Sequence, residues 1–288
     1  MRIAFQGAAG AYSEAAAIRD WPQAETVGFE TFEEVFGAVA AGRVSHGILP
    51  VENSIGGSIH RNYDLLLDHD LPIVGETELP VVHNLLALPG VTLGSIRRVF
   101  SHPQGLAQCE QYLKRLPGVE LVATYDTAGS ARLIRDQKLT DTAAVASARA
   151  AEIFELAVLQ ASIQDYRDNI TRFLLVARDP QALGTPDKTS VVFALPNAPG
   201  ALFKALSVFA LRDIDLTKLE SRPMRGRPWE YLFYVDLGAG RADLRCARAI
   251  VHLEESARWV KILGSYARWN EASMKTLVPE SSVDVSAV

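Results

Sequence analysis

Thr171 and Arg172 are two adjacent residues whose side chains could bind a substrate and give it a proton. They follow Asn169 and Ile170 and precede Phe173, at the start of a long apolar run. A guanidinium can bind a carboxylate through two parallel hydrogen bonds, and a hydroxyl can donate a hydrogen bond or a proton to a leaving oxygen. Along a regular strand the two side chains point to opposite faces, so a shared site requires the strand to begin or bend here. The alternative is a strand-edge threonine, favoured by β-propensity, beside a surface arginine.

A second candidate is the segment from Pro50 to Ser58 (PVENSIGGS), in which Glu52, Asn53 and Ser54 follow an apolar run. Ligands of open α/β sheets bind at the edge where such strands end. The two glycines that come next allow backbone amides to approach an oxyanion. An ordinary turn is the alternative, but it does not require this many polar residues, so we favour a binding role.

Two further segments, Gly7–Glu14 (GAAGAYSE) and Ser101–Gln104 (SHPQ), lie between a predicted strand and a predicted helix. A helix N-terminus after a glycine turn can bind an anion. The first segment lacks the middle glycine of the dinucleotide-binding fingerprint, which argues against a nicotinamide cofactor. Ser13 and Ser101 could instead cap their helices, and His102 could be a general acid or base or a structural residue.

Two segments near the C-terminus, Asn197–Leu202 and Glu220–Pro223, could bind an amino acid. The first offers small residues at a helix start. In the second, Glu220 and Arg222 could pair with an ammonium and a carboxylate. Charged residues are also usual in turns, so a solvated hairpin remains the alternative.

The elements that must position these residues alternate between strand and helix up to about residue 178. Strands are predicted at Ile3–Gln6, Thr26–Phe29, Gly47–Val51, Ile73–Glu78, Val82–Ala87, Arg98–Phe100, Glu120–Tyr125, Ala143–Ala146 and Thr171–Ala177. Helices are predicted at Ser13–Arg19, Thr31–Ala41, Ser58–Asp68, Pro103–Leu116, Ala128–Asp136 and Ser147–Phe154. Such alternation favours mainly parallel α/β sheets, and nine strands suggest two lobes.

The chain changes character beyond residue 178. Residues 179–188 (DPQALGTPDK) carry two prolines and a glycine and are predicted to form a linker. The next elements are predicted at Ser190–Leu195, Gly200–Arg212, Asp215–Glu220, Glu230–Leu237, Leu244–Ser256 and Lys261–Ala267. Their βαββαβ order is ferredoxin-like. The tail from Pro279 to Val288 has no periodicity and is expected to be frayed.

Composition limits the classes of function. The 288 residues are 48% hydrophobic, enough for two or three cores. With 29 Lys and Arg against 34 Asp and Glu, the net charge of −5 disfavours nucleic-acid binding. A local pocket can still bind a small anion. Cys109 and Cys246 are isolated, which favours a reducing compartment, and the sequence shows no apolar run of membrane-spanning length and no signal-peptide pattern.

The order of these motifs resembles that of prephenate dehydratases joined to a C-terminal ACT regulatory domain. The resemblance spans about residues 1–270 and depends on GAYSEAA, LPVENSIGGSIHRNYDLL, FSHPQGLAQC, Asp126-Thr127-Ala128, IQDYRDNITRFLLVAR, NAPGALFKAL and LTKLESRP. It implies a two-lobed catalytic domain like type II periplasmic binding proteins, with the active site between the lobes, and a ferredoxin-like βαββαβ ACT domain. The implied limits are 1–178 for the catalytic domain (lobe 1 about 1–78 and 168–178, lobe 2 about 79–167), with hinges near Glu76–Val82 and Ile163–Thr171, then 179–188 for the linker, 189–270 for the ACT domain and 271–288 for the tail.

The resemblance implies a lyase that converts prephenate to phenylpyruvate with loss of water and carbon dioxide, without metal or cofactor. Thr171 would be the proton donor, Arg172 would bind a substrate carboxylate and Phe173 would shape the pocket. The polar lining would comprise Tyr12, Ser13, Glu52, Asn53, Ser54, Ser58, Ser101 and His102. A threonine hydroxyl is a weak acid, so a neighbour must polarise it, and Glu52, Asn53 and His102 are the candidates.

The ACT resemblance implies feedback regulation by L-phenylalanine, bound between two ACT domains of a homodimer or homotetramer. The effector residues would be Asn197, Gly200, Ala201, Leu202, Glu220, Ser221, Arg222 and Pro223. The stretch Ser58–Leu66 is similar to the plant enzymes that prefer arogenate, so an arogenate dehydratase is the alternative, and a non-catalytic amino-acid sensor is a third. The expected location is the cytoplasm, or the plastid stroma for a plant enzyme that has lost its transit peptide, with no nucleic-acid or membrane partner.

Overall fold

The computed structural model describes residues 1–269. Its strands are β1 (Arg2–Gln6), β2 (Glu25–Phe29), β3 (His46–Asn53), β4 (Gly57–Ser58), β5 (Ile73–Pro80), β6 (Asn84–Ala87), β7 (Arg98–Ser101), β8 (Glu120–Ala123), β9 (Thr142–Ala146), β10 (Ala157–Gln160), β11 (Ile170–Ala177), β12 (Lys188–Ala194), β13 (Leu216–Pro223), β14 (Tyr231–Leu237) and β15 (Trp259–Tyr266). Its helices are α1 (Tyr12–Asp20), α2 (Phe32–Ala40), α3 (His60–Asp68), α4 (Pro103–Ala107), α5 (Glu110–Leu113), α6 (Thr127–Gln137), α7 (Ala148–Ile153), α8 (Ala201–Ala210) and α9 (Leu244–Ser256), with a 3₁₀ turn at Leu93–Ser95. None of these helices is long and apolar enough to cross a lipid bilayer.

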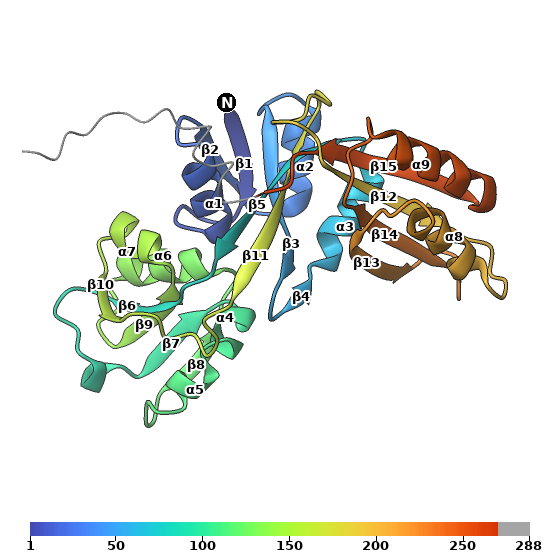
Figure 1. Cartoon of the computed structure of the whole chain (residues 1–288). Coiled ribbons are helices and arrows are strands. Elements are labelled where there is room, and N and C mark those ends of the chain that lie inside the picture. Colours follow the sequence, from blue (N-terminus) through green and yellow to red (C-terminus); the bar gives the residue numbers. More distant parts are fainter. Residues whose placement is uncertain (270–288) are drawn as a thin grey trace, which may run out of the picture.

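These strands form two sheets. The larger has the order β13-β14-β12-β15-β5-β11-β3-β1-β2, with β4 paired to β3, and the smaller has the order β10-β6-β9-β7-β8. The long strands β5 and β11 run side by side between the two lobes (Figure 1). Because β5 ends at Pro80 and β11 begins at Ile170, the chain enters and leaves the smaller sheet between these residues. The expected α/β class with two lobes is confirmed.

The sheets are mixed, so the expectation of mainly parallel sheets was only partly right. The pairs β1–β2, β1–β3, β7–β8 and β7–β9 are parallel. The pairs β3–β11, β5–β11, β6–β9 and β6–β10 are antiparallel. The reason is topological: a strand that returns from the other lobe re-enters its sheet in the opposite direction. The short strand β10 was not predicted.

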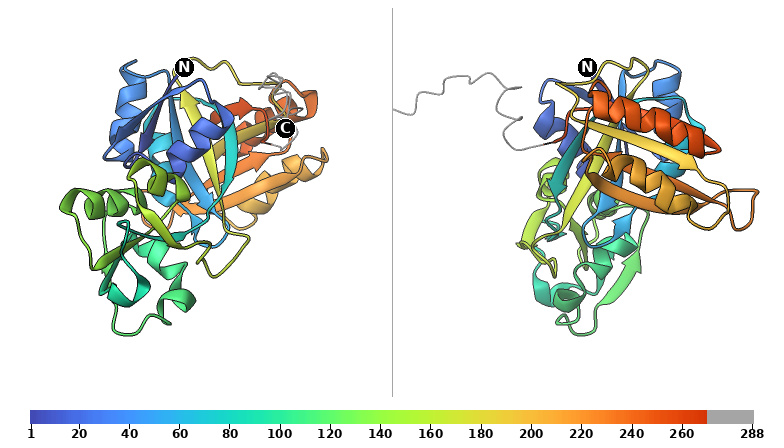
Figure 2. Two further views of the ribbon diagram at one scale, coloured as in Figure 1. Left: turned by 90° about the vertical axis from the view of Figure 1, so that its left-hand side faces the viewer. Right: turned by 45° about the vertical axis from the view of Figure 1, so that its right-hand side comes forward.

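The C-terminal unit, residues 188–266, has the predicted βαββαβ order, and its strands continue the larger sheet. Helices α8 and α9 cover one face around buried Phe193, Phe209 and Leu253. Helix α3 covers the other face, where Tyr63 packs on Tyr234 with ring centroids 5.1 Å apart. Figure 2 shows that this unit and the lobe of the smaller sheet attach to different parts of the N-terminal region.

One residue pair joins β15 of this unit to β5 of the N-terminal region: Gly264 opposite Ile73. A Cβ atom on Gly264 would lie 2.2 Å from the carbonyl oxygen of Ile73, which is backbone and cannot move aside cheaply. Only glycine therefore allows the two parts to share one sheet.

Several predicted helix starts differ from the structure. Helix α1 has Ala11 as its N-cap, so Ser13 lies inside the first turn and does not cap. Ser58 belongs to β4, and α3 begins two residues later. The predicted helix Pro103–Leu116 is two helices, because the carbonyl of Gln108 accepts the amide of Asp165. The prediction of a frayed tail at Pro279–Val288 lies outside the described residues.

Candidate functional site

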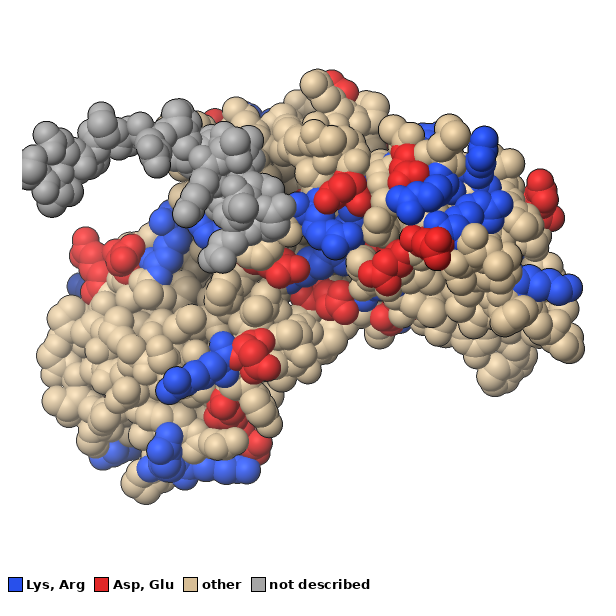
Figure 3. Space-filling model, viewed as in Figure 1, with Lys and Arg blue, Asp and Glu red and all other residues tan. Residues whose placement is uncertain are grey.

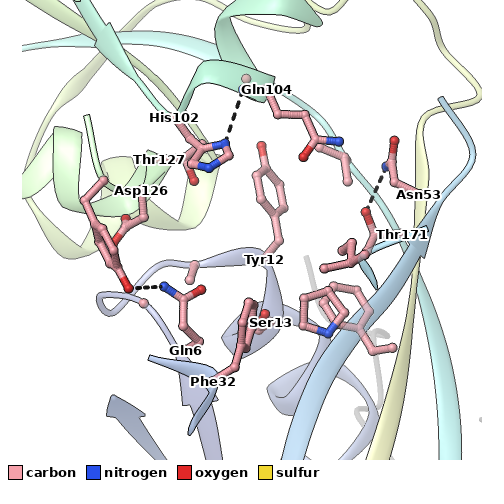
Figure 4. A pocket seen from close by; sticks show the side chains of 18 of the residues that line it. Gln6, Tyr12, Ser13, Phe32, Asn53, His102, Gln104, Asp126, Thr127 and Thr171 are labelled. Carbon is pink, nitrogen blue, oxygen red and sulfur yellow. Dashed lines mark hydrogen bonds between the residues drawn. The ribbon is translucent and has the colours of Figure 1, made fainter. Parts of the chain in front are cut away.

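A cavity of about 470 Å³ lies between the two lobes. Helices α1, α4 and α6 begin at its wall, and β3 and β11 cross it near the lobe boundary (Figure 4). Its polar lining consists of Gln6, Tyr12, Ser13, Thr31, Glu33, Asn53, His83, His102, Gln104, Gln108, Tyr125, Asp126, Thr127 and Thr171. A concave site of this size with convergent polar groups suits a small polar ligand.

Thr171 faces this cavity with its hydroxyl oxygen already engaged as an acceptor. Its Oγ1 accepts a hydrogen bond from Nδ2 of Asn53 at 3.0 Å, drawn in Figure 4. The orientation of the Asn53 amide is fixed, because its Oδ1 accepts the backbone amides of Ile55 (3.1 Å) and Gly56 (2.7 Å). Since Asn53 can only donate to Thr171, the threonine proton is available to another acceptor, and the accepted bond polarises it.

Three buried side-chain amides form a closed ring beneath Thr171. Asn53 Nδ2 donates to Asn169 Oδ1 (2.7 Å), Asn169 Nδ2 donates to Gln108 Oε1 (3.0 Å), and Gln108 Nε2 donates to Asn53 Oδ1 (3.2 Å). The ring links the end of β3 to the start of β11 and to the break between α4 and α5. The ring therefore fixes Asn53, which donates to Thr171, to residues of both lobes.

The ring continues to His83 and Tyr12. Nε2 of His83 lies 2.9 Å from Gln108 Oε1, and Nδ1 lies 2.9 Å from the hydroxyl of Tyr12. Burial lowers the pKa of His83, although the hydrogen bond to Gln108 opposes this, and burial raises the pKa of Tyr12 well above its usual value. Both side chains are therefore uncharged at neutral pH, with the His83 proton on Nε2 facing the carbonyl oxygen of Gln108.

The helix starts differ in how their first amides are satisfied. In α4 the N-cap is His102, whose Nδ1 accepts the amide of Gln104 (3.2 Å), and in α6 the N-cap is Asp126, which accepts the amide of Gly129. Burial lowers the pKa of His102, against the opposing effect of Asp126. The N-cap of α1, Ala11, has no side-chain oxygen, so the first turn of α1 can offer its amides to a carboxylate in the cavity.

The fully charged side chains in the cavity wall are acidic: Glu33 and Asp126, with no lysine or arginine among the described lining residues. Glu33 is paired with Arg61, and its own backbone amide and that arginine lower the pKa of Glu33. A carboxylate-bearing ligand must therefore be held mainly by amides and hydroxyl groups.

Arg172 does not line this cavity. Its Nε lies 2.8 Å from Glu76 and its Nη1 2.7 Å from Asp236, on the opposite face of β11 from Thr171. The irregularity in the pairing of β11 with β3 falls after Arg172, so Thr171 and Arg172 alternate as in a regular strand, and Phe173 lies at the cavity with Thr171. In this arrangement the Arg172 guanidinium does not reach the cavity, where the resemblance had it bind a substrate carboxylate.

Four other residues expected in the polar lining also lie elsewhere. Ser101 is buried and donates to the carbonyl of Val145, so His102 and not Ser101 caps α4. Ser54 donates to the carbonyl of Asp168 at the crossover between the lobes. The remaining two, Glu52 and Ser58, face the C-terminal unit through Lys218. The structure thus brings together Tyr12, Ser13, Asn53, His102, Thr171 and Phe173 from the expected set.

Three residues of this network, Gln108, Asn169 and His83, were not among the expected site residues. Gln108 stands between the apolar residues Ala107 and Cys109 in the segment FSHPQGLAQC. That pattern is the signal that could have identified it, since buried amides must find hydrogen-bond partners.

A second, smaller cavity of about 150 Å³ lies in the C-terminal unit. It is lined by Asn197, Ala201 and Leu202 of the expected effector residues and by Trp229 and Tyr231. Gly200, at φ +78°, is the N-cap of α8 beside it.

The segment Glu220-Ser221-Arg222-Pro223 lies on β13 and does not line this cavity. Glu220 accepts hydrogen bonds from Ser58 (2.8 Å) and lies 2.9 Å from His60, and Arg222 lies 3.3 Å from Asp64. Burial alone would raise the pKa of Glu220, but the hydrogen bonds from Ser58 and His60 lower it overall. In this chain the motif therefore contacts the N-terminal region.

Fold and cavity together define a two-lobed α/β protein with a polar cavity between its lobes. The family model for prephenate dehydratase matches residues 3–181, and the chain belongs to this family. Its members are dehydratases, which are lyases, so the protein is an enzyme of aromatic amino acid biosynthesis.

Among curated relatives, the chain is 52% identical over 277 residues to arogenate dehydratase/prephenate dehydratase 2, chloroplastic, of Arabidopsis thaliana, covering 92% of this chain and 72% of the relative. It is 52% identical to arogenate dehydratase 2 of Petunia hybrida, over 92% and 71% of the two chains.

Two solved structures cover 93% of the chain, each with a TM-score of 0.85. One is a prephenate dehydratase in complex with L-Phe from Arthrobacter aurescens, 33% identical and covered over 90% of its length. The other is described as GqqA, a novel type of quorum-quenching acylase, 36% identical and covered over 98%.

Proposed function

We propose that the chain converts prephenate to phenylpyruvate, with Thr171 as the acid. The observation that carries this role is the hydrogen bond from Asn53, which leaves the Thr171 proton directed away from Asn53. As the bond between ring and carboxylate breaks, its electron pair enters the ring and the ring hydroxyl departs. Thr171 donates its proton to that hydroxyl, so water and carbon dioxide leave together, and the hydroxyl of Thr171 is restored from solvent.

Arogenate is the second candidate substrate. It carries an ammonium where prephenate carries a keto group, and the charged cavity residues Glu33 and Asp126 are acidic. A carboxylate near an ammonium lowers the energy of the bound zwitterion, whereas the same carboxylate repels a dianion. The relatives named above carry arogenate dehydratase in their names, alone or beside prephenate dehydratase.

The deciding experiment supplies purified protein with prephenate and, in parallel, with arogenate. Phenylpyruvate from the first is followed by its ultraviolet absorbance and phenylalanine from the second by chromatography. The matched control is Thr171→Ala, which we expect to lower kcat by about 100-fold with little change in KM. Near wild-type turnover by that variant would contradict the acid role, and absence of product from both substrates would contradict the proposed reaction.

The C-terminal unit supports a regulatory proposal: an ACT domain, spanning residues 189–270, that binds L-phenylalanine in a homodimer or homotetramer. The support is the second cavity, lined by Asn197, Ala201 and Leu202, the position of β13 at a sheet edge where a second copy could pair, and a related structure described with L-Phe. We expect millimolar L-phenylalanine to inhibit the full-length enzyme. Unchanged activity would contradict this regulation.

An acylase activity is not proposed, despite the GqqA likeness. A threonine nucleophile needs an adjacent base, and among the described residues the side-chain partner of the Thr171 hydroxyl is the Asn53 amide, which is not one.

For location we propose the cytoplasm or a plastid stroma. Two free, buried cysteines suit such reducing compartments, and the Arabidopsis relative is named chloroplastic.

A further inference from the structure

A buried cluster of charges joins β11 to the C-terminal unit. Arg172 contacts Glu76 (2.8 Å) and, across the junction, Asp236 (2.7 Å) and the hydroxyl of Tyr266 (3.1 Å). Lys188 contacts Glu76 at 2.9 Å. We call these five residues the junction cluster. Figure 3 shows charged side chains of both signs gathered between the N-terminal region and the C-terminal unit.

Each part of the molecule contributes one cation and one anion to the junction cluster, and ion pairs cross between the parts. The N-terminal region supplies Arg172 and Glu76, whose side chains are 11% and 2% exposed, and the C-terminal unit supplies Lys188 and Asp236, at 7% and 8%. Removing one partner leaves a buried charge uncompensated, which is strongly unfavourable. The position of Arg172 therefore depends on where the C-terminal unit holds Asp236.

The carboxylate of Asp236 is itself held in place from its own side. The hydroxyl of Ser190 donates to Oδ1 at 2.5 Å and lies 2.7 Å from the hydroxyl of Tyr266. Burial alone would raise the pKa of Asp236, but the charges of Arg172 and Lys188 outweigh it and lower that pKa. Asp236 is thus an ionised, rigid partner rather than a mobile surface carboxylate.

A second ionic contact reaches the neighbouring strand in the same way. Glu52, one residue before Asn53, lies 3.2 Å from Nζ of Lys218, whose side chain is 6% exposed. Lys218 stands on β13, two residues before Glu220, and both contact the hydroxyl of Ser58. The strand that carries the proposed effector segment is therefore in direct contact with the end of β3.

The two contacts flank the hydrogen bond between Asn53 and Thr171. Thr171 lies opposite Asn53 and Arg172 lies opposite Glu52 in the pairing of β11 with β3. Thr171 is thus the covalent neighbour of Arg172, and Asn53 is the covalent neighbour of Glu52. The C-terminal unit holds both Arg172 and Glu52 by ion pairs. A displacement of Asp236 or Lys218 can therefore be passed through Arg172 or Glu52 to the backbone beside Thr171 or Asn53.

We propose that Arg172 and Glu52 are positioning residues through which the C-terminal unit sets the hydrogen bond from Asn53 to Thr171. Effector binding to that unit changes turnover because it displaces Asp236 and Lys218 and so alters this bond. The inference rests on the proposed roles of Thr171 and L-phenylalanine. It gives Arg172 a function on the face of β11 opposite the cavity.

The test removes the charge of Asp236 by Asp236→Asn, with Asp70→Asn as the matched control. Asp70 also bridges the two parts, 3.3 Å from Lys261, but its side chain is fully exposed and far in sequence from β3 and β11. We expect Asp236→Asn to lower kcat about fivefold with KM within about twofold, and to reduce inhibition by saturating L-phenylalanine about fivefold while calorimetry still detects its binding. Asp70→Asn should match the wild type in all four quantities.

A readout independent of activity separates this inference from the proposed function. In ¹⁵N-labelled protein, the side-chain amide resonance of Asn53 should shift in Asp236→Asn and stay in place in Asp70→Asn. An Asn53 resonance and a kcat both unchanged by Asp236→Asn would overturn the inference. A wild-type protein that is inactive or insensitive to L-phenylalanine would instead contradict the proposed function, with the resonance still reporting on the coupling.

Thermal unfolding first establishes that Asp236→Asn is folded. If it is not, Lys218→Gln tests the second contact by the same measurements, because Lys218 is a partner of Glu52 rather than of Arg172. A folded Lys218→Gln with wild-type kcat, inhibition and Asn53 resonance would then overturn the inference.

Discussion

Asn53 decides how Thr171 can use its proton. Two backbone amides occupy the carbonyl oxygen of Asn53, so its amino group is the part that faces Thr171. A residue of the same size with an acceptor in place of the Asn53 amino group would reverse the direction of its hydrogen bond with Thr171. The threonine would then donate to residue 53 and no longer to a substrate.

Asn53→Asp should therefore lower kcat by about 100-fold, the scale of losing general acid catalysis, with a smaller change in KM. Steady-state kinetics measure this, with thermal unfolding alongside. The control is Asn62→Asp, the same exchange at a buried asparagine that donates to the carbonyl of Pro50 and does not itself line the cavity. If both variants lose activity to the same degree, general destabilisation explains the result and the directional hydrogen bond does not.

Cavity residues that lie beside chain turns could be predicted from the sequence. Cavity residues whose roles depend on partners far along the chain could not. Thr171 and Asn53 stand in segments with an unusual density of polar residues. Gln108 and His83 acquire their roles from each other across 25 positions of the chain, which spacing alone does not reveal. The family resemblance assigned Arg172 to the site, which required the strand to begin or bend at Thr171, but the irregularity in the pairing falls after Arg172.

Several helices begin at the cavity wall, and Asp126 has two roles at the start of α6. It caps α6 by accepting the amide of Gly129, and it places a negative charge in the cavity wall. A serine can accept the same amide without the charge. The two tasks are therefore separable by mutation.

We expect Asp126→Ser to raise the ratio of kcat/KM for prephenate to that for arogenate about fivefold, because the removed carboxylate repels a dianion and attracts an ammonium. Parallel kinetics with both substrates measure the ratio. Asp126→Ala, the control for the cap, should also lose about 1 kcal/mol of unfolding free energy. An unchanged ratio in Asp126→Ser would remove Asp126 from substrate selection.

Elements were more predictable than side-chain roles. The βαββαβ order of the C-terminal unit and most of the N-terminal strands and helices follow from their periodicity. The break between α4 and α5 does not, because its cause is a bond from the distant amide of Asp165 to the carbonyl of Gln108. A helical pattern in the sequence cannot show that one of its carbonyls has another partner.

The whole molecule depends on a continuous sheet whose two parts meet at one residue pair. Gly264 and Ile73 are far apart in sequence, so nothing in local composition predicts that β15 and β5 adjoin. The sequence predicts a linker at residues 179–188 and does not indicate how the parts that it joins contact each other. The structure buries charged and apolar side chains at that contact.

Gly264→Ala should lower the free energy of unfolding by about 3 kcal/mol, since its Cβ would overlap the Ile73 backbone. Calorimetry should show one transition for the wild type and a separated, earlier transition of the C-terminal unit in the variant. Gly94→Ala, where a Cβ meets nothing within 4 Å, is the control. A variant that unfolds like the wild type would show that the pair does not join the parts energetically.

The amide ring beneath Thr171 has a consequence for the pH–rate profile. Its three members, Asn53, Asn169 and Gln108, do not ionise, and the adjoining His83 and Tyr12 have pKa values displaced below 6.5 and above 10.0 respectively. Between those values every hydrogen bond of the ring keeps its direction. We therefore expect kcat to form a broad plateau rather than a bell, and to fall only in acid, where His83 gains a second proton beside the ring.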